Sequence, residues 1–381
     1  MVYDMALWAA LILLGIGVVH RIDGWFLRDV GLGDRNVTTA ERLGAAVKGG
    51  ARTVFGPGLV KVLKVVVVDV LLQARILRDR REPMLWLMHI CIFWGFVLLL
   101  VFHALGSTFA GLVSSTYVST LNPFLFLRNL FGVVMAVGLV LAVVRRVALK
   151  TEVRTGGGDV LAIVILAVIA CSGFVLEGVK ITADSRFDGM VKTYAGGLPA
   201  DQYQALKAYW VADFGLVPAK PVPSHDPTVI AAGRALHEAG CQGCHAKPTS
   251  AFASYALSRV ASPVAASLDR PAVLDGLWYL HVLACCVGLA YLAFSKMFHV
   301  VSTPVSLLVA EVTGNQQSAA AAATRQALEL DGCSHGGACH EECPVRVRRM
   351  ERIGPGAGYE PMLAFTERKS PTDLGSRPVS S

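Results

Sequence analysis

Five long runs of apolar residues set the hydropathy pattern of this chain. A helix that crosses a membrane needs about 20 mostly apolar residues. The runs lie near residues 3–20, 84–105, 122–144, 158–180 and 274–299. The pattern therefore predicts an all-α membrane protein with five transmembrane helices, the second to fourth of which occupy residues 84–180.

A further apolar run, at residues 65–72, is too short to cross a membrane. Basic residues flank it on both sides, among them Lys61, Lys64 and Arg75. Apolar residues bordered by basic ones are typical of a helix that lies in the membrane surface. We therefore expect an interfacial amphipathic helix within residues 21–83.

The basic residues also predict the orientation of the spans. Residues 21–83 contain twelve Lys and Arg and the link between the third and fourth spans contains four, whereas residues 104–121 contain none. By the positive-inside rule the first two segments are cytoplasmic and the third is external. With a first span at residues 1–20, the N-terminus and the loop 181–273 are then external. The tail 300–381 is cytoplasmic, in a bacterial inner membrane.

The composition excludes several other classes of protein. Hydrophobic residues make up 54% of the chain and charged residues 17%, whereas a soluble domain carries about 25% charged residues. The net charge of +7 does not indicate a nucleic-acid partner, because Lys and Arg stand between the apolar runs and form no stripe. Nine cysteines, divided among spans, loop and tail, do not fit a small disulfide scaffold.

Two of the predicted spans each carry a pair of histidines at membrane depth, where ionisable side chains are rare. His89 and His103 are fourteen residues apart on the second span, and His281 and His299 are eighteen apart on the fifth. At 100° per residue each pair returns to within about 40° of one helix face. Because the two spans run in opposite directions, His89 should face His299 near the cytoplasmic side. His103 should face His281 near the external side.

Two opposed imidazole pairs indicate two bis-histidine haem sites, and therefore two haem b groups. The alternative is that the histidines only form hydrogen bonds with neighbouring helices. Three glycines near them would let a porphyrin approach the backbone: Gly95, Gly106 and Gly288. His20, at the end of the first span, is interpreted as an interfacial residue and not as a ligand.

The external loop contains the sequence Cys241-Gln-Gly-Cys244-His245, which is the C-x-x-C-H pattern of covalent haem c attachment. The two thiols form thioethers to the haem, and the histidine becomes an iron ligand. A zinc knuckle and a disulfide are the alternatives. Haem c is attached on the outer side of bacterial membranes, which agrees with the external position that the basic residues predict.

The sixth ligand of this iron is open among three residues, His225, His237 and Met190. About 29 residues separate the motif from the fifth span, too few for a complete cytochrome c domain. His237 lies only four residues before Cys241, from where the distal face of the haem is hard to reach. His225 is therefore the preferred candidate.

The cytoplasmic tail contains a second cysteine cluster, formed by Cys333, Cys339 and Cys343 with His335 and His340 between them. Cys and His ligands can hold an iron–sulfur cluster or zinc, although this spacing matches no standard set. The alternative is a disordered segment that a partner orders on docking. The predicted architecture is thus five spans, an interfacial helix, an external haem c loop and a cytoplasmic tail.

With these residues in place, the chain resembles the gamma subunit family of respiratory nitrate reductase. Within it, the chain is most similar to the cytochrome b subunits of heterodisulfide-reductase-like complexes, including the sulfite-reductase-linked complex and the transmembrane redox complex of sulfate reducers. Residues 69–96 (DVLLQARILRDRREPMLWLMHICIFWGF) and the pair His281 and His299 carry the resemblance, which covers roughly residues 1–310. It implies a cytoplasmic iron–sulfur partner and a quinone site near the external haem. The haem c loop and the cysteine-containing tail depart from the nitrate reductase pattern.

The sequence therefore predicts a membrane cytochrome b subunit of a respiratory complex. It would exchange electrons between the quinone pool, an external multihaem cytochrome c and a cytoplasmic heterodisulfide-reductase-like iron–sulfur subunit. The rival hypothesis is a membrane haem-handling protein or redox sensor without quinone chemistry. Four intramembrane ligands favour the conduit, because a handling site needs only one accessible pair. A structural anchor for a soluble enzyme would need no buried histidines.

Overall fold

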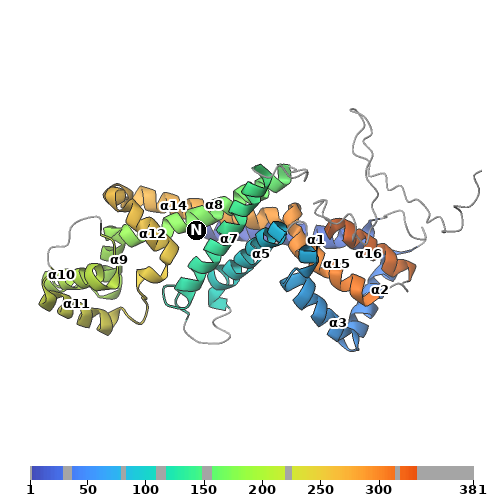
Figure 1. Ribbon diagram of the computed structural model, residues 1–381, viewed down its shortest axis with the longest axis horizontal. Helices are drawn as coiled ribbons and strands as arrows, with labels where there is room; N and C mark the ends of the chain where they lie inside the picture. Colours follow the sequence, from blue (N-terminus) through green and yellow to red (C-terminus); the bar gives the residue numbers. More distant parts are fainter. Residues whose placement is uncertain are drawn as a thin grey trace, which may run out of the picture. The chain divides into compact units, whose positions relative to one another are not determined.

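The chain forms helices throughout the residues that the computed structural model describes (Figure 1). These are residues 2–28, 37–78, 83–108, 117–147, 157–218, 225–313 and 318–332. No strand occurs in them, which confirms the all-α class. The tail cysteines Cys333, Cys339 and Cys343, predicted as a cluster, lie outside the described residues.

Within the described residues, five helices are long and apolar enough to cross a membrane, which confirms the five predicted spans as structural elements. They are α1 (Val2–Leu27), α5 (Pro83–Leu99) with the π-helical turn η2 (Leu100–Ala104), α7 (Phe124–Val147), α8 (Gly157–Thr182) and α14 (Pro271–Phe294).

The other helices lie between and after the spans. Before the second span come α2 (Thr39–Val54), α3 (Gly58–Val65), the π-helical turn η1 (Val66–Leu71) and α4 (Ala74–Arg78). The loop before α14 holds α9 (Asp184–Tyr194), α10 (Ala200–Tyr209), η3 (Trp210–Phe214), α11 (Pro227–Gly240), η4 (Pro248–Ser250), α12 (Phe252–Ala261), η5 (Ser262–Val264) and α13 (Ala265–Leu268). After α14 come η6 (Lys296–Phe298), α15 (His299–Thr313) and α16 (Ala319–Gly332).

The helices group into two compact units. One unit comprises Met1–Arg21 and Lys64–Val300, and the other comprises Ile22–Leu63 and Val301–Ser381. The first unit therefore contains four complete spans, most of α1, the loop helices and all four membrane histidines. The two units are described separately.

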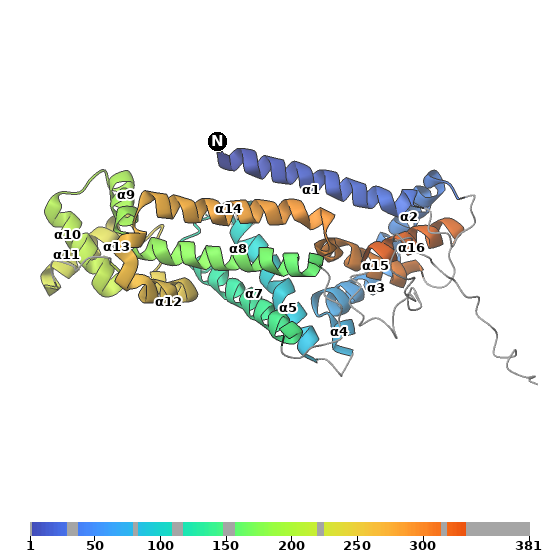
Figure 2. The same cartoon turned by 90° about the horizontal axis from the view of Figure 1, so that it is seen from above.

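Glycines set the close approach of the spans in the first unit. A Cβ on Gly95 of α5 would lie 2.6 Å from Met135 of α7, and one on Gly138 of α7 would lie 2.7 Å from Ile92. Helices α8 and α14 lie side by side in both views (Figures 1 and 2), and Gly288 faces the methyl groups of isoleucines on α8. Small residues allow such contacts in membrane helices.

These contacts correct the expectation that glycines near the histidines admit a porphyrin. The space beside Gly95 is filled by the backbone of α7, and the space beside Gly288 is filled by side chains of α8. Gly106 lies against the hydroxyl of Tyr117. The three glycines therefore serve contacts within the protein, and the interpretation of them as porphyrin contacts is wrong.

The predicted interfacial segment, residues 65–72, is helical and continues from α3 through the turn η1. Two indoles of α5 satisfy carbonyls at its end, since Trp94 Nε1 donates to Leu71 O at 3.0 Å and Trp86 Nε1 donates to Leu72 O at 2.9 Å. The next residue, Gln73, has φ of 52°, a left-handed conformation that costs free energy for a residue with a side chain. The chain turns there and returns towards α5.

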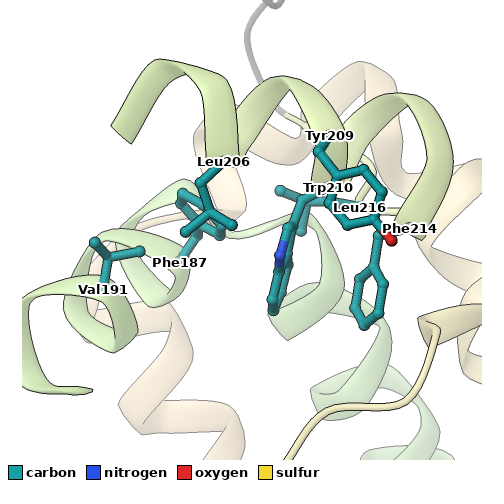
Figure 3. Close-up of a cluster of buried hydrophobic side chains, with 7 residues drawn as sticks. All are labelled: Phe187, Val191, Leu206, Tyr209, Trp210, Phe214 and Leu216. Atoms are coloured by element: carbon teal, nitrogen blue, oxygen red, sulfur yellow. The ribbon is translucent and has the colours of Figure 1, made fainter. Parts of the chain in front are cut away.

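The loop between α8 and α14 folds into a helical module with its own hydrophobic core (Figure 3). The buried side chains are Phe187, Val191, Leu206, Tyr209, Trp210, Phe214 and Leu216. Helices α10 and α11 approach closely because Gly233 lies against the carbonyl oxygen of Ala205. From the sequence we counted only the residues after the motif and so underestimated the size of this module. Its core is built from residues that precede the motif.

The second unit is held by polar contacts at helix ends. Trp25 Nε1 donates to Asp331 Oδ2 at 2.9 Å, and Arg42 donates to the carbonyls of Phe26 and Arg28 at 3.0 and 2.8 Å. Thr303 Oγ1 donates to the carbonyl of Gly332, at the end of α16, at 3.0 Å. The described part of this unit thus ends at Gly332, the residue before Cys333, and the carbonyl of Gly332 is held by Thr303.

Two glycines on α1 provide a matched test of this packing. A Cβ on Gly17 would lie 2.5 Å from the Cβ of Ala293 on α14, whereas one on Gly15 would meet nothing within 4 Å. We expect Gly17→Ala to lower the free energy of unfolding by about 1–3 kcal/mol through overpacking. Gly15→Ala should leave it unchanged or raise it by up to about 1 kcal/mol, because alanine favours helix. Thermal unfolding in detergent measures both, and equal effects would contradict the contact.

Candidate metal centres

Two pairs of histidines face each other at opposite ends of α5. His103, in the turn η2, lies opposite His281 of α14 with ring centres 6.2 Å apart, and we call this the 103/281 pair. His89, near the start of α5, lies opposite His299 with ring centres 5.9 Å apart, and we call this the 89/299 pair. The structure thus brings the four histidines together in the two pairs that the sequence predicts.

The spacing of the rings fits a metal ion between them. A metal–imidazole bond of about 2 Å on each side of one ion puts two opposed ring centres about 6 Å apart. A bare metal ion held by protein alone usually needs about four ligands. No cluster of three or more His, Cys, Asp or Glu side chains that could hold a metal occurs among the described residues. Two opposed imidazoles are the ligands that a haem iron can take from a protein.

The hydrogen bonds of the 89/299 pair strengthen this interpretation. His89 Nδ1 donates to Gln73 Oε1 at 2.8 Å, and His299 Nδ1 donates to the carbonyl of Lys296 at 2.6 Å. Both Nε2 atoms are then lone-pair acceptors, which cannot hydrogen-bond to each other. A metal ion would satisfy both of them, and such bonds to the other nitrogen are the usual way in which proteins orient histidine ligands.

The 103/281 pair has a comparable support on α8. The hydroxyl of Ser172 donates to the carbonyl of Ile169 at 3.2 Å, which leaves its oxygen to accept from His281 Nδ1 at 3.0 Å. The neighbouring Gly173 has no side chain, and a Cβ there would lie 3.0 Å from the ring of His281. Helix α8 therefore fixes the orientation of this imidazole.

Sequence reasoning missed these supporting residues. Gln73 is buried, with 5% of its surface exposed, and its left-handed backbone conformation is of the kind often found at functional sites. Its signal in the sequence was a polar amide directly after the apolar run 65–72. Ser172 carried no distinguishing signal, because one serine in an apolar span is common.

The sequence predicts the fifth span, residues 274–299, as one continuous helix, and the structure shows that this is wrong. Helix α14 ends at Phe294, and Ser295 is extended with φ of −117° and ψ of 177°. The hydroxyl of Ser295 then accepts from the amide of Met297 at 3.1 Å, which starts the turn η6, and α15 begins at His299. His299 reaches His89 through this break and not through five uninterrupted helical turns.

Arg21 of α1 supports the break. Its guanidinium donates to the carbonyl of Ala293 at 3.0 Å and to that of Ser295 at 3.3 Å. The guanidinium also lies over the ring of Phe298, 5.5 Å from its centre. A helix end leaves carbonyls without partners, and a cation there also interacts favourably with the helix dipole.

The C-x-x-C-H motif lies at the end of α11. Cys241 follows the last residue of the helix, and the amides of Cys244 and His245 donate to its carbonyl at 3.1 and 3.0 Å. The ring of His245 lies 5.5 Å from that of Trp210, in the core of the module. Burial there, with a smaller effect of the charge of His237, lowers the pKa of His245. The neutral form of this imidazole, which is the form that can bind a metal ion, is thereby favoured.

The three sixth-ligand candidates take different places. His225 lies just before the N-cap of α11, and this helix of fourteen residues places it about 20 Å from the motif. That separation argues against the preferred candidate, His225. Met190 packs against the core of the module. His237 is 5% exposed, and its Nδ1 is buried without a hydrogen-bond partner. Met190 and Cys241 pack against the same core, and the amide of Cys241 donates to the carbonyl of His237 at 2.8 Å.

Comparison with known proteins finds similarity to the E subunit of dihydromethanophenazine:CoB–CoM heterodisulfide reductase. The proteins from Methanosarcina barkeri and Methanosarcina acetivorans are each 32% identical over 129 residues, covering 31% of this chain and 47% of theirs. The protein from Methanosarcina thermophila is 29% identical over 127 residues. The chain thus spans about half the length of the curated relatives it matches.

No family model matches the chain, and no solved structure matches it. The similarity to a heterodisulfide reductase subunit supports that side of the resemblance seen in the sequence. The narrower relation to nitrate reductase gamma subunits stays a prediction.

Replacing Arg21 tests the helix break. We expect Arg21→Met to lower the free energy of unfolding by about 1–2 kcal/mol, because the carbonyl of Ala293 at the end of α14 loses its donor and that of Ser295 loses one of two. We also expect haem b content to fall, because His299 is held less firmly opposite His89. Arg186→Met is the control, since Arg186 is an exposed residue 3.5 Å from Asp275. Thermal unfolding and a pyridine haemochrome assay measure the two effects, and equal results for both variants would contradict this role.

Proposed function

We propose that this chain is the cytochrome b subunit of a quinone-linked respiratory electron-transfer complex. The observation that carries the proposal is the 89/299 pair. Its two rings lie 5.9 Å apart, and each has its Nδ1 committed to an oxygen acceptor. At the other end of α5 the rings of the 103/281 pair lie 6.2 Å apart, and His281 Nδ1 is hydrogen-bonded to Ser172.

The two pairs support a pathway across a membrane. Fourteen residues of helix between His89 and His103 correspond to about 21 Å, which is most of a hydrocarbon core about 30 Å thick. A haem iron accepts and donates single electrons, and its potential depends on axial ligands, hydrogen bonds and burial. In this chain, Gln73, Lys296 and Ser172 orient three of the four rings that would ligate iron.

The loop module supports a third redox site. Cys241 and Cys244 would attach one haem c, and His245 would ligate its iron from the core of the module. The chain would then exchange electrons with an external multihaem cytochrome c. The motif lies at the end of α5 that carries His103, since Thr120, shortly after that end, hydrogen-bonds to Ala246. This agrees with the orientation that the basic residues predict, with an external N-terminus and a cytoplasmic tail in a bacterial inner membrane.

The relatives support a partner of the heterodisulfide reductase kind. Their name describes one subunit of an enzyme that pairs dihydromethanophenazine with a heterodisulfide. For this chain we propose a membrane quinone as the lipid-soluble carrier and an iron–sulfur subunit on the cytoplasmic side. The region with Cys333, Cys339 and Cys343 would contribute to that docking surface.

Haem content tests the proposal directly. We expect purified protein to contain haem b and haem c in a ratio of two to one, because two histidine pairs and one C-x-x-C-H motif are present. A pyridine haemochrome spectrum distinguishes the two types. A one-to-one ratio or an absence of haem c would contradict the assignment of the sites. Reduction of haem b by a quinol analogue separates the proposal from a haem-handling protein or redox sensor.

Single histidine variants test the pairing. His103→Ala and His281→Ala should each remove the same haem b, because both rings hold one iron. His89→Ala and His299→Ala should each remove the other, so that haem b falls from two per chain to one. An optical redox titration identifies which midpoint potential disappears. The pairing is wrong if His103→Ala and His299→Ala remove the same component.

A further inference from the structure

The segment that follows the 103/281 pair hydrogen-bonds directly to the C-x-x-C-H motif. The carbonyl of Thr120 accepts from the amide of Ala246 at 3.0 Å. The hydroxyl of the same threonine donates to the carbonyl of Cys244. These two partners are the residues on either side of His245, so Thr120 holds both peptides that flank the proposed haem c ligand.

The contact continues along the chain after the motif. Asn122 Nδ2 donates to the hydroxyl of Ser250 at 2.9 Å. Two residues into α7, the ring of Phe126 lies 5.8 Å from that of Phe252, at the start of α12. Residues 120–126 therefore contact residues 244–252 at three successive positions.

A buried polar network anchors this contact among the spans. Ser254 of α12 and Asn129 of α7 are 0% and 1% exposed. The amide of Ser254 donates to Asn129 Oδ1 at 3.1 Å, and its hydroxyl donates to Glu177 Oε2 of α8 at 2.7 Å. Asn129 Nδ2 donates to the same carboxylate at 2.7 Å, and Arg128 forms an ion pair with it. Breaking one bond of such a network leaves a buried polar group unsatisfied.

The other side of the segment is joined to the peptide before His103. The hydroxyl of Tyr117 donates to the carbonyl of Phe102 at 3.3 Å. Arg128 of α7 donates to the carbonyl of Ser119 at 3.3 Å. Between Tyr117 and Thr120, this segment thus contacts the backbone next to His103 and the backbone next to His245. We call residues 117–122 the bridge.

We infer that the bridge fixes the loop module on the spans and that electrons pass within one chain between the 103/281 site and the His245 site. The inference rests on the proposed function. With haem held by His103 and His281 and by His245, one electron would leave a ferrous iron at one site and reduce a ferric iron at the other, with no proton moved and no bond broken. The alternative is a tethered module that must leave and return at each transfer.

Two variants of the bridge weaken the contact without touching a proposed ligand. Thr120→Val removes the hydroxyl donor at nearly unchanged volume, and Asn122→Ala removes the second side-chain bond. Thr120→Ser keeps the donor and serves as the rescue. The matched control is Thr193→Val with Gln202→Ala, because both residues are exposed on helices of the same module.

The first measurement is hydrogen exchange of the full-length protein in detergent. Loss of two hydrogen bonds should raise the opening of residues 244–252 by about tenfold or more. The control pair and Thr120→Ser should leave exchange unchanged. Unchanged exchange in the Thr120→Val, Asn122→Ala double variant would overturn the docking, and this arm does not depend on haem content.

The second measurement is the rate of electron equilibration between haem b and haem c after photoreduction, at several glycerol concentrations. A fixed contact gives a rate in the parent protein that does not follow solvent viscosity. The double variant should be slower by about tenfold, with a rate that falls as viscosity rises. A parent rate that already falls with viscosity would overturn the inference. Missing haem would instead contradict the proposed function, and exchange would still decide whether the module is docked.

Discussion

An imidazole among apolar helices costs free energy unless its nitrogens have partners, and this constraint governs the first unit. His89, His281 and His299 are half-buried and His103 is exposed. The chain supplies acceptors to three of these rings, Gln73 to His89, Lys296 to His299 and Ser172 to His281. Each acceptor comes from an element other than the helix that carries its histidine. A turn before α5, a break after α14 and a close approach of α8 therefore follow from the same requirement.

The pairing of the histidines was predictable because it depends on few quantities. Helical spacing places His89 and His103 on one side of a helix, and the alternating direction of five spans decides which partner each one meets. The break at Ser295 was not predictable on these grounds. Eighteen residues of uninterrupted helix would also return to the same face, so the periodicity agreed with a helix that the structure does not contain. The polar pair after the apolar run of α14, Ser295 and Lys296, was the available signal.

Other parts of the site depended on tertiary contacts that no local pattern records. Gly95 and Gly288 had been assigned to a porphyrin because they lie near ligands in the sequence. Their contacts are instead with helices that are distant in the sequence. His225 was preferred over His237 because four residues looked too short a distance from Cys241. The length of α11 shows that greater separation in the sequence moves a residue away from the motif. In a rigid helix, separation becomes distance at about 1.5 Å per residue.

The placement of the loop module follows from polar chemistry at the end of the spans. A carboxylate such as Glu177 is costly near a membrane unless charged and neutral donors surround it. Two of its donors, Arg128 and Asn129, come from α7, and the third, Ser254, comes from the module. Removing the module would therefore expose part of a buried network, so the network and the module stabilise each other. A loop bound in this way is part of the span bundle, and the order of contacts from His103 through residues 117–122 to His245 is a property of the fold itself.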